Sequence, residues 1–374
     1  MKKLIALALA VMMVLALSAC GSNVDTAALD EILTTVQALQ EQVEALAAAA
    51  PAEAAPAPAA DEAPAEEAPA AEPAGELAPK DGGTSLNLST GSDTGTYYAF
   101  GGVMAQKVSE VTSTSVTAIT SGGSKANIEA LEMGDAELGF VQSDVMAYGY
   151  AGTRLFEETG AVENFSTVAA MYMEQVQIVT LNPDIQSVSD LEGKNVSIGA
   201  AGSGVYFNAI DILGVYGLTE EDINPTYQNF GDSVEALQDG QIDAAFIVAG
   251  APTNAVTSLA ATNDVYLVSL DAEHIAELVA LSPYYTEYTI SADTYGMPED
   301  ATTVAVGAVI IARDDVSDAD VYNFLYGVFE NLDNLGHDKA KEVSLEFATS
   351  VTDVPYHPGA AAYFADKGID VPVK

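Results

Sequence analysis

The stretch from Ser89 to Gly102, STGSDTGTYYAFGG, has residue types that suit an anion-binding loop. It follows an alternating apolar run and leads into a helical pattern, so a strand is expected to pass through a Gly/Ser/Thr loop into a helix. Such a loop offers free backbone N–H groups at the positive end of a helix dipole. A Walker loop needs a lysine where Thr96 stands, and the spacing of Gly91 and Gly95 does not fit a dinucleotide fingerprint. We therefore expect a small polar or carboxylate ligand, with Tyr97 or the next tyrosine as a flat wall.

A repeat further along the chain indicates the elements that position this loop. The segments IEALEMGDAELGFV, from Ile128, and VEALQDGQIDAAFI, from Val234, match at five aligned positions, an offset of 106 residues. Each has the pattern of an amphipathic helix, a glycine stop and a buried strand. A second strand, Gly-rich loop and helix precede the later segment. The alternation of strands and helices predicts an α/β, two-lobed fold, with mostly parallel sheets and a ligand cleft between lobes.

The loops at the strand ends are the candidate binding site, because ligands of parallel sheets lie outside the carboxyl ends of the strands. A core position is an alternative for Tyr97, and helix capping is an alternative for Ser143 and Asp144. The candidate ligand-binding residues on these loops are Gly95, Thr96, Tyr97, Ser121, Gly122, Asn127, Gln142, Ser143, Asp144, Gly202, Ser203, Gly204, Pro252 and Thr253.

The charged residues restrict the ligand and the partners. From Thr84 on the chain has two arginines, Arg154 and Arg313, and neither stands at a predicted strand end, so no arginine clamp for a carboxylate is expected. Lys125 is the one cation well placed in a predicted loop, either as a counter-ion or as an outward-pointing helix lysine. The chain carries 55 acidic and 12 basic residues, a net charge of −43. Nucleic acid is excluded as a partner, since its binding needs a basic patch.

The residues needed for common catalytic chemistry are missing from the pattern. Cys20 is the only cysteine, and the three histidines lack metal-ligand spacing. Ser203 is not in a G-x-S-x-G elbow, because Ala201 stands where the first glycine is required. We therefore expect a binding protein that uses no metal and no cofactor, and not an enzyme.

The first eighty residues predict an exported, tethered protein. Two lysines precede an apolar run that ends in LSAC, the order of an export signal with a lipobox, so Cys20 would carry the lipid. A signal peptide cut elsewhere is the alternative. Apolar residues at heptad spacing over 29–46 predict a short coiled coil with weak self-association, or a single amphipathic helix. The Ala/Pro/Glu-rich run after it cannot bury a core and should be an extended linker.

The predicted organisation therefore has five parts. The crossing to the second lobe is expected in the run 167–182, and the return in SPYYTEYTIS, 282–291. The parts are a lipoprotein signal peptide (1–20), a short helix (21–50), a disordered linker (51–83), lobe 1 (84–172 plus 290–374) and lobe 2 (173–289).

From Thr84 to about Val373 the chain resembles the TAXI-type solute receptors of tripartite ATP-independent periplasmic (TRAP) transporters. The resemblance implies the two-lobed type 2 periplasmic-binding-protein-like fold. The resemblance rests on GTYY, SGGSKANIEALEMGDAELGFVQSD, DLEGKNVSIGAAGSGV, EALQDGQIDAAFIVAGAPT and FENLDNL…HPGAAAYFADKGI, in this order. It adds Tyr172 and Glu174, which match a Tyr-x-Glu of the family, to the candidate ligand-binding residues. Glu174 would suit a ligand ammonium group, and a hinge salt bridge is the alternative.

The resemblance implies an extracytoplasmic receptor, lipid-anchored to the outer face of a bacterial cell membrane. It would capture a small anionic metabolite, an amino acid or a dicarboxylate such as glutamate or 2-oxoglutarate, by cleft closure. TRAP permease membrane subunits would receive the solute. A receptor for an ABC importer or a sensor kinase with the same fold is the alternative, and an enzyme on this fold is the third.

Overall fold

The computed structural model of the chain describes residues 77–374. The predicted signal peptide, the lipidation site Cys20, the heptad segment and most of the linker lie outside the described residues. Within the described range, none of the helices has the length and apolar character needed to cross a membrane.

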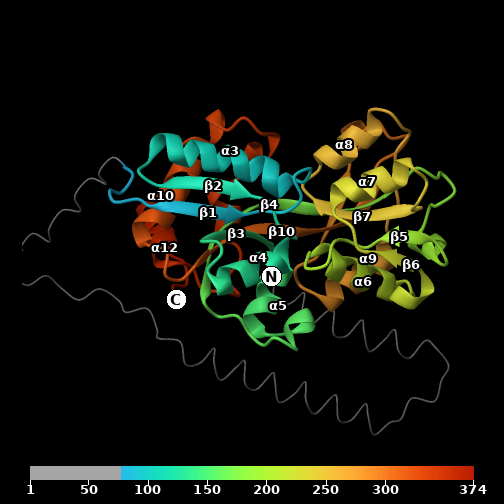
Figure 1. Cartoon of the computed structure of the whole chain (residues 1–374), viewed down its shortest axis with the longest axis horizontal. Helices are drawn as coiled ribbons and strands as arrows, with labels where there is room; N and C mark the ends of the chain where they lie inside the picture. Colours follow the sequence, from blue (N-terminus) through green and yellow to red (C-terminus); the bar gives the residue numbers. More distant parts are fainter. Residues whose placement is uncertain (1–76) are drawn as a thin grey trace, which may run out of the picture. The chain divides into compact units, whose positions relative to one another are not determined.

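The first lobe is built on three parallel strands, with β1 between β2 and β3 (Figure 1). Each strand leads into a helix, as the sequence predicts: β1 and β2 through a short loop, and β3 directly. The elements are β1 (Ser85–Ser89), α3 (Thr96–Val111), β2 (Ser115–Ile119), α4 (Ser124–Met133), β3 (Leu138–Gln142), α5 (Ser143–Ala151) and η1 (Arg154–Phe156).

The second lobe repeats this order, with β5 between β6 and β7 in parallel. The predicted glycine stops are confirmed: α4 is followed by Gly134 at φ 79°, and Gly240 after α7 has φ 65°. The elements are η2 (Val188–Leu191), β5 (Asn195–Ser197), α6 (Val205–Val215), η3 (Glu220–Asp222), β6 (Asn224–Thr226), α7 (Phe230–Gln238), β7 (Ala244–Ala249), α8 (Asn254–Ala260), β8 (Tyr266–Leu267), α9 (Ala272–Leu281), β9 (Thr286–Ile290) and η4 (Ala292–Thr294).

Two long antiparallel strands, β4 (Phe165–Thr180) and β10 (Ala301–Arg313), run through both lobes and join them. β4 pairs with β10 and then with β7, whereas β10 pairs with β9 at its start and with β3 at its end. The result is one continuous ten-stranded sheet, in which eight strands follow the order β2-β1-β3-β10-β4-β7-β5-β6, β8 pairs with β4 and β9 pairs with β10. β4 covers most of the run 167–182, where the crossing is predicted. β9, which lies in the predicted return at 282–291, pairs with the start of β10. The bounds of the two lobes stay a prediction.

Neighbouring strand residues point into different cores, so helices cover both faces of the sheet. Phe140 and Val141 belong to separate clusters in the first lobe, and Phe246 and Ile247 do so in the second. The chain ends on the first lobe, where α10 and α12 add to the core under α3. These last elements are α10 (Asp318–Phe329), η5 (Leu332–Asn334), η6 (Asp338–Lys341), α11 (Leu345–Ala348) and α12 (Pro358–Asp366).

Candidate functional site

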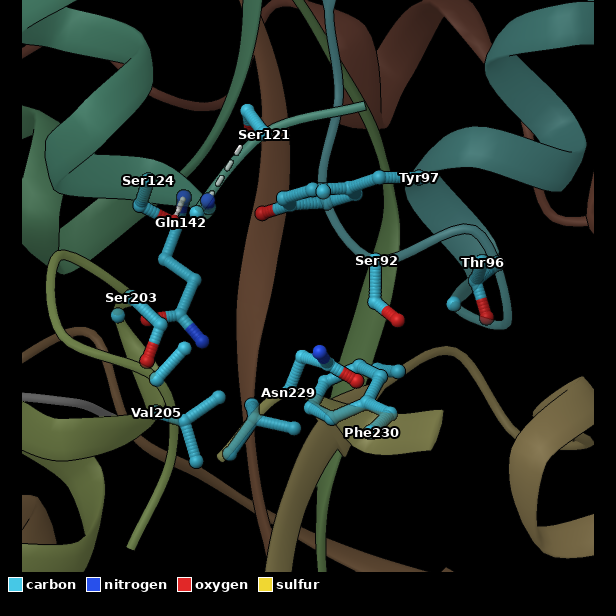
Figure 2. A pocket seen from close by; sticks show the side chains of 18 of the residues that line it. Ser92, Thr96, Tyr97, Ser121, Ser124, Gln142, Ser203, Val205, Asn229 and Phe230 are labelled. Carbon is cyan, nitrogen blue, oxygen red and sulfur yellow. Dashed lines mark hydrogen bonds between the residues drawn. The ribbon is translucent and has the colours of Figure 1, made fainter. Parts of the chain in front are cut away.

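A cavity of about 300 Å³ lies where the loops of the two lobes meet, at the N-terminal ends of α3, α4, α6 and α7 (Figure 2). The first lobe and β4 line it with Gly91, Ser92, Gly95, Thr96, Tyr97, Ser121, Gly122, Gly123, Ser124, Gln142 and Glu174. The second lobe lines it with Ala200, Ser203, Gly204, Val205, Tyr227, Gln228, Asn229, Phe230, Asp232, Val248 and Ala249. The four helix ends direct N–H groups and positive dipole ends toward one cavity.

Glycines let the two lobes approach closely at the cavity wall. Gly123, the residue before α4, has φ 107°, and a Cβ there would lie 3.3 Å from Ser203 of the other lobe. A Cβ on Gly204 would overlap Oε1 of Gln142. Position 123 therefore favours glycine for its backbone conformation, and a side chain at position 204 would force Gln142 to move. Gly95, in contrast, has an extended φ of −95° that any residue can adopt.

Tyr97 forms an aromatic wall of the cavity, and its ring stacks on Phe140 with centroids 4.5 Å apart. Its hydroxyl donates to Oε2 of Glu174 at 3.1 Å. Burial raises the pKa of the Glu174 carboxyl well above its usual range, and the charge of Asp144 adds to this effect. This shift favours the protonated form of Glu174. It can donate a hydrogen bond, or lose the proton to pair with an ammonium group.

Two buried oxygens at the cavity have no hydrogen-bond partner: Oε1 of Gln142 and Oγ of Ser203. Figure 2 shows these two side chains next to each other on one side of the cavity. A buried polar atom without a partner is costly, so groups of this kind mark a place where a ligand or water completes the bonding.

None of the residues that line the cavity is lysine or arginine. Lys125 pairs with Glu129 on its own helix, and its ammonium group lies over the ring of Phe156. Arg154 binds Asp211, and Arg313 binds Asp315 and Glu137. Any anion in the cavity would depend on helix ends and hydroxyl groups for its stabilisation.

Nine of the sixteen candidate ligand-binding residues line the cavity, and seven do not. Those that line it are Gly95, Thr96, Tyr97, Ser121, Gly122, Gln142, Glu174, Ser203 and Gly204. Those outside the lining are Asn127, Ser143, Asp144, Tyr172, Gly202, Pro252 and Thr253. Ligand contact stays a prediction for the first set.

The second set supports the walls. The buried Asn127 amide donates to the carbonyl oxygens of Thr90 and Phe140, and so holds two loops together. Ser143 accepts from the N–H of Gly307 at 3.1 Å, and the carbonyl of Gly202 accepts from the N–H of Ala126 across the lobes at 3.0 Å. Asp144 faces the second lobe and not the cavity.

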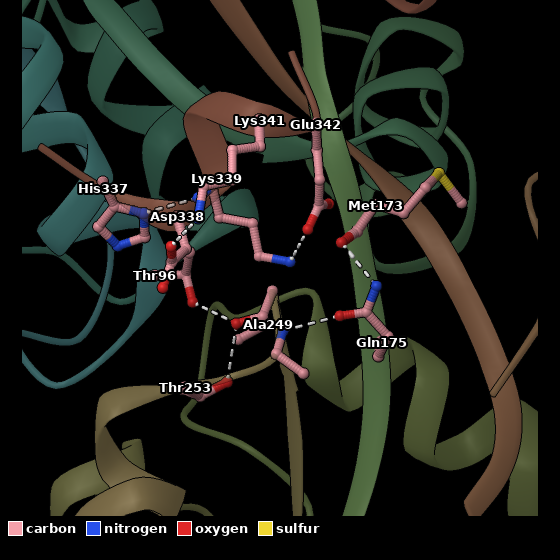
Figure 3. Close-up of polar contacts among 12 residues, drawn as sticks. Thr96, Met173, Gln175, Ala249, Thr253, His337, Asp338, Lys339, Lys341 and Glu342 are labelled. Carbon is pink, nitrogen blue, oxygen red and sulfur yellow. Dashed lines mark hydrogen bonds and ion pairs between the residues drawn. The ribbon is translucent and has the colours of Figure 1, made fainter. Parts of the chain in front are cut away.

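The remaining three lie near the crossing strands. Thr96 and Thr253, from different lobes, both donate to the carbonyl of Gly250 (Figure 3). Pro252 follows Ala251 through a cis peptide bond. Tyr172 is buried under the ammonium group of Lys339, 5.6 Å from its ring centre. Lys339 is buried itself and pairs with Glu342 at 2.6 Å.

Sequence reasoning missed the loop after β6, which supplies Tyr227, Gln228, Asn229, Phe230 and Asp232. The internal sequence repeat could have identified this loop. An offset of 106 residues places 228–232 in register with 122–126, the loop that lines the cavity from the first lobe. Asn229 caps α7 by accepting from the N–H of Asp232 at 3.0 Å, so its polar side chain has a local role as well.

A protein-family model, described as the NMT1-like family, matches residues 88–368. This range includes both lobes and all the loops that line the cavity. The chain belongs to the NMT1-like family.

Several solved structures resemble this NMT1-like chain at low sequence identity. The periplasmic aliphatic sulphonate binding protein SsuA from Escherichia coli is 16% identical, with 75% of this chain and 83% of that chain covered and a TM-score of 0.38. A putative L-cystine ABC transporter from Listeria monocytogenes is 15% identical, with 71% and 98% covered and a TM-score of 0.42. The GluR0 ligand-binding core from Nostoc punctiforme, in complex with L-glutamate, is 16% identical, with 66% and 93% covered and a TM-score of 0.38.

Proposed function

We propose that this NMT1-like protein is an extracytoplasmic receptor that captures a small carboxylate solute between its lobes and presents it to a membrane importer. The observation that carries the proposal is the cavity itself. Four helix ends from two lobes meet at it, and two buried side-chain oxygens in its wall lack partners. A ligand bound there would form contacts with both lobes at once. Such contacts exist only when the lobes are close together, so the solute stabilises the closed form.

The wall favours a solute with one carboxylate. Helix ends can hold one such group, each contributing on the order of 0.3–2 kcal/mol. A second carboxylate would find no cationic side chain in the lining and would face Glu174 and Asp232. An amino acid, whose ammonium group could take the place of the proton on Glu174, therefore fits better than a dicarboxylate such as 2-oxoglutarate. For glutamate, its second carboxylate would need neutral donors such as Gln142 and Ser203.

Solute entry requires the lobes to separate, because they touch beside the cavity. The N–H of Ala255 donates to the carbonyl of Thr94 at 3.1 Å, and Thr96 donates to the carbonyl of Gly250 at 2.8 Å. β4 and β10 remain as the connection when these contacts break. We propose a hinge in these two strands, with the return of the chain in β10.

For the importer, we place an ABC-type system first. A TRAP permease, which only the sequence resemblance implies, comes second. Anchoring of the receptor through Cys20 completes the proposal, as a lipid would keep it beside its importer. We propose a binding role for this site.

The test is a thermal-shift screen of amino acids, dicarboxylates and oxo-acids, followed by calorimetry with the solute that binds. Gln142→Met and Ser203→Ala remove the two unpartnered oxygens. Each should weaken solute binding about fivefold, since one hydrogen bond is worth about 1 kcal/mol. The empty Ser203→Ala protein should become no less stable, because the removed oxygen has no partner. Ser258→Ala, at an exposed position of α8, is the matched control.

If Gln142 and Ser203 instead had a general structural role, their substitutions would lower both the affinity for the solute and the stability of the empty protein. Wild-type affinity in both variants would contradict the assignment of this cavity as the solute site.

A further inference from the structure

A chain of polar contacts joins the two lobes beside the cavity. It starts at Arg154 of η1, whose Nη2 binds Oδ1 of Asp211 on α6 at 2.5 Å. The hydroxyl of Tyr285, which lies just before β9, donates to Oδ2 of Asp211 at 2.9 Å. Nδ2 of Asn208 on α6 then donates to the Tyr285 oxygen at 3.0 Å and to Oδ2 of Asp144 on α5 at 3.1 Å. The chain thus leaves the first lobe at Arg154 and returns to it at Asp144.

Two oxygens of this chain have no partner, Oδ1 of Asp144 and Oδ1 of Asn208. Both side chains are fully buried, with 0% of their surface exposed. An amide oxygen needs a donor, and the contacts around it supply none. A proton on Oδ1 of Asp144 is such a donor. The acid and the amide would then be joined by two hydrogen bonds, N–H to Oδ2 and O–H to the amide oxygen.

The charges around Asp144 lead to the same conclusion. Arg154 is the one cation of the cluster and is bound to Asp211, which leaves Asp144 without a counter-ion. Burial raises the pKa of Asp144 to about 7, and the charge of Asp211 also raises it. The N–H groups that bond to the carboxylate lower it, but the effect of burial is larger. The ionisable groups that face Asp144 are Tyr148 on its own helix, Arg154 on η1, Asp211 on α6, Tyr284 and Tyr285 before β9, and Glu174 on β4.

We propose that closure of the two lobes takes up one proton, which Asp144 binds and shares with Asn208 across the lobe interface. This inference rests on the proposed capture of a solute by closure. When the lobes separate, water reaches Asp144, and the carboxyl returns to the behaviour of an exposed aspartate, with a pKa near 3.9. The closed form is therefore a proton-binding form.

The sign of the pH effect follows from linkage. The pKa of Asp144 is higher in the closed form than in the open form, so the closed form gains from protonation below pH 7 and loses this gain as pH rises through 7. With values of about 7 and about 3.9, the ratio of closed to open molecules should be about thirty-fold higher at pH 5.5 than at pH 8.

Distances between spin labels on the full chain measure this ratio directly. Cys20→Ser removes the natural thiol, and cysteines at Glu110 of α3 and Gln238 of α7, both exposed, carry one label on each lobe. Asp144→Asn keeps the shape and mimics the protonated acid, because its amide can donate to Asn208. Asp135→Asn, an exposed position of the first lobe, is the matched control.

We expect the labelled protein without solute to shift toward the short distance between pH 8 and pH 5.5. The Asp144→Asn variant should show the short distance at both pH values, and the Asp135→Asn variant should behave as the unmutated chain does. An equal pH response with and without Asp144 would overturn the proposal, and would point to Glu174 or another group. If Asp144→Asn fails to fold, Asn208→Leu decides, since it removes the acceptor of the proton and should reduce the pH response.

A bound solute separates this proposal from the proposed function. If a solute from the screen shortens the distance while pH does not, proton-coupled closure is wrong and the receptor proposal stands. If neither solute nor pH changes the distance, capture by closure fails and this inference fails with it.

Discussion

At the scale of single residues, the buried carboxyl of Glu174 gives a testable pH effect on stability. Its pKa is raised in the folded state and is near 4.3 in an unfolded chain. The protonated form is therefore favoured by folding, and the associated stability is lost as pH rises from about 4.3 through the raised value. Glu174→Gln keeps an acceptor for the hydroxyl of Tyr97 and cannot ionise.

We therefore expect Glu174→Gln to unfold at a higher urea concentration than the wild type at pH 8, with a smaller difference at pH 5. Urea unfolding at both pH values measures it. Glu235→Gln, at an exposed position of α7, should show no such change. A Glu174→Gln effect of equal size at pH 5 and pH 8 would mean that Glu174 is not buried as a neutral acid.

The same scale shows why the sequence could not place every site residue. Gln142, Ser143 and Asp144 are consecutive, and the pattern marks all three as strand-end polar residues. Only the structure reveals that the first turn of α5 directs them to three different neighbours: the cavity, the N–H of Gly307 and α6. Side-chain direction at a helix start depends on how the helix packs, and spacing in the sequence carries no such information.

At the scale of elements, sequence patterns predicted the repeated helix, glycine stop and buried strand well. Local chemistry determines these features, namely helix periodicity and a left-handed glycine at the helix end. These sequence patterns did not predict that β10 runs through both lobes. A buried run of 13 residues reads as one strand of one lobe, and nothing in its composition shows that it passes through both. Pairing with β9 and β3 is a long-range property.

The start of α7 gives a prediction at this scale. Asn229 caps the helix and also lines the cavity. Asn229→Ala should lower the free energy of unfolding by about 1 kcal/mol, the usual cost of a lost cap. Asn229→Ser keeps a capping oxygen and should recover most of this loss. Urea unfolding measures both variants, and equal stability of the two would show that the cap contributes nothing.

At the scale of the whole molecule, the net charge of −43 has a consequence for stability that is independent of the site. From Thr84 on the chain has 42 acidic and 9 basic residues, so the folded part is itself strongly negative. Packing these charges into one compact unit, 71–374, brings like charges together, and the repulsion opposes folding. Salt screens such repulsion over a distance of about 10 Å at 0.1 M.

We therefore expect the melting temperature at pH 7.5 to rise by a few degrees between 0.01 M and 0.3 M sodium chloride. A gain of about 1 kcal/mol would correspond to roughly 2–4 °C for a domain of this size class. The control is the same titration near pH 4.1, the isoelectric point, where the net charge vanishes. There the salt effect should disappear, because protonated carboxyls no longer repel each other. An equal rise at both pH values would attribute the effect to general salting-out of apolar surface, and the acidic surface would then carry no measurable cost to the fold.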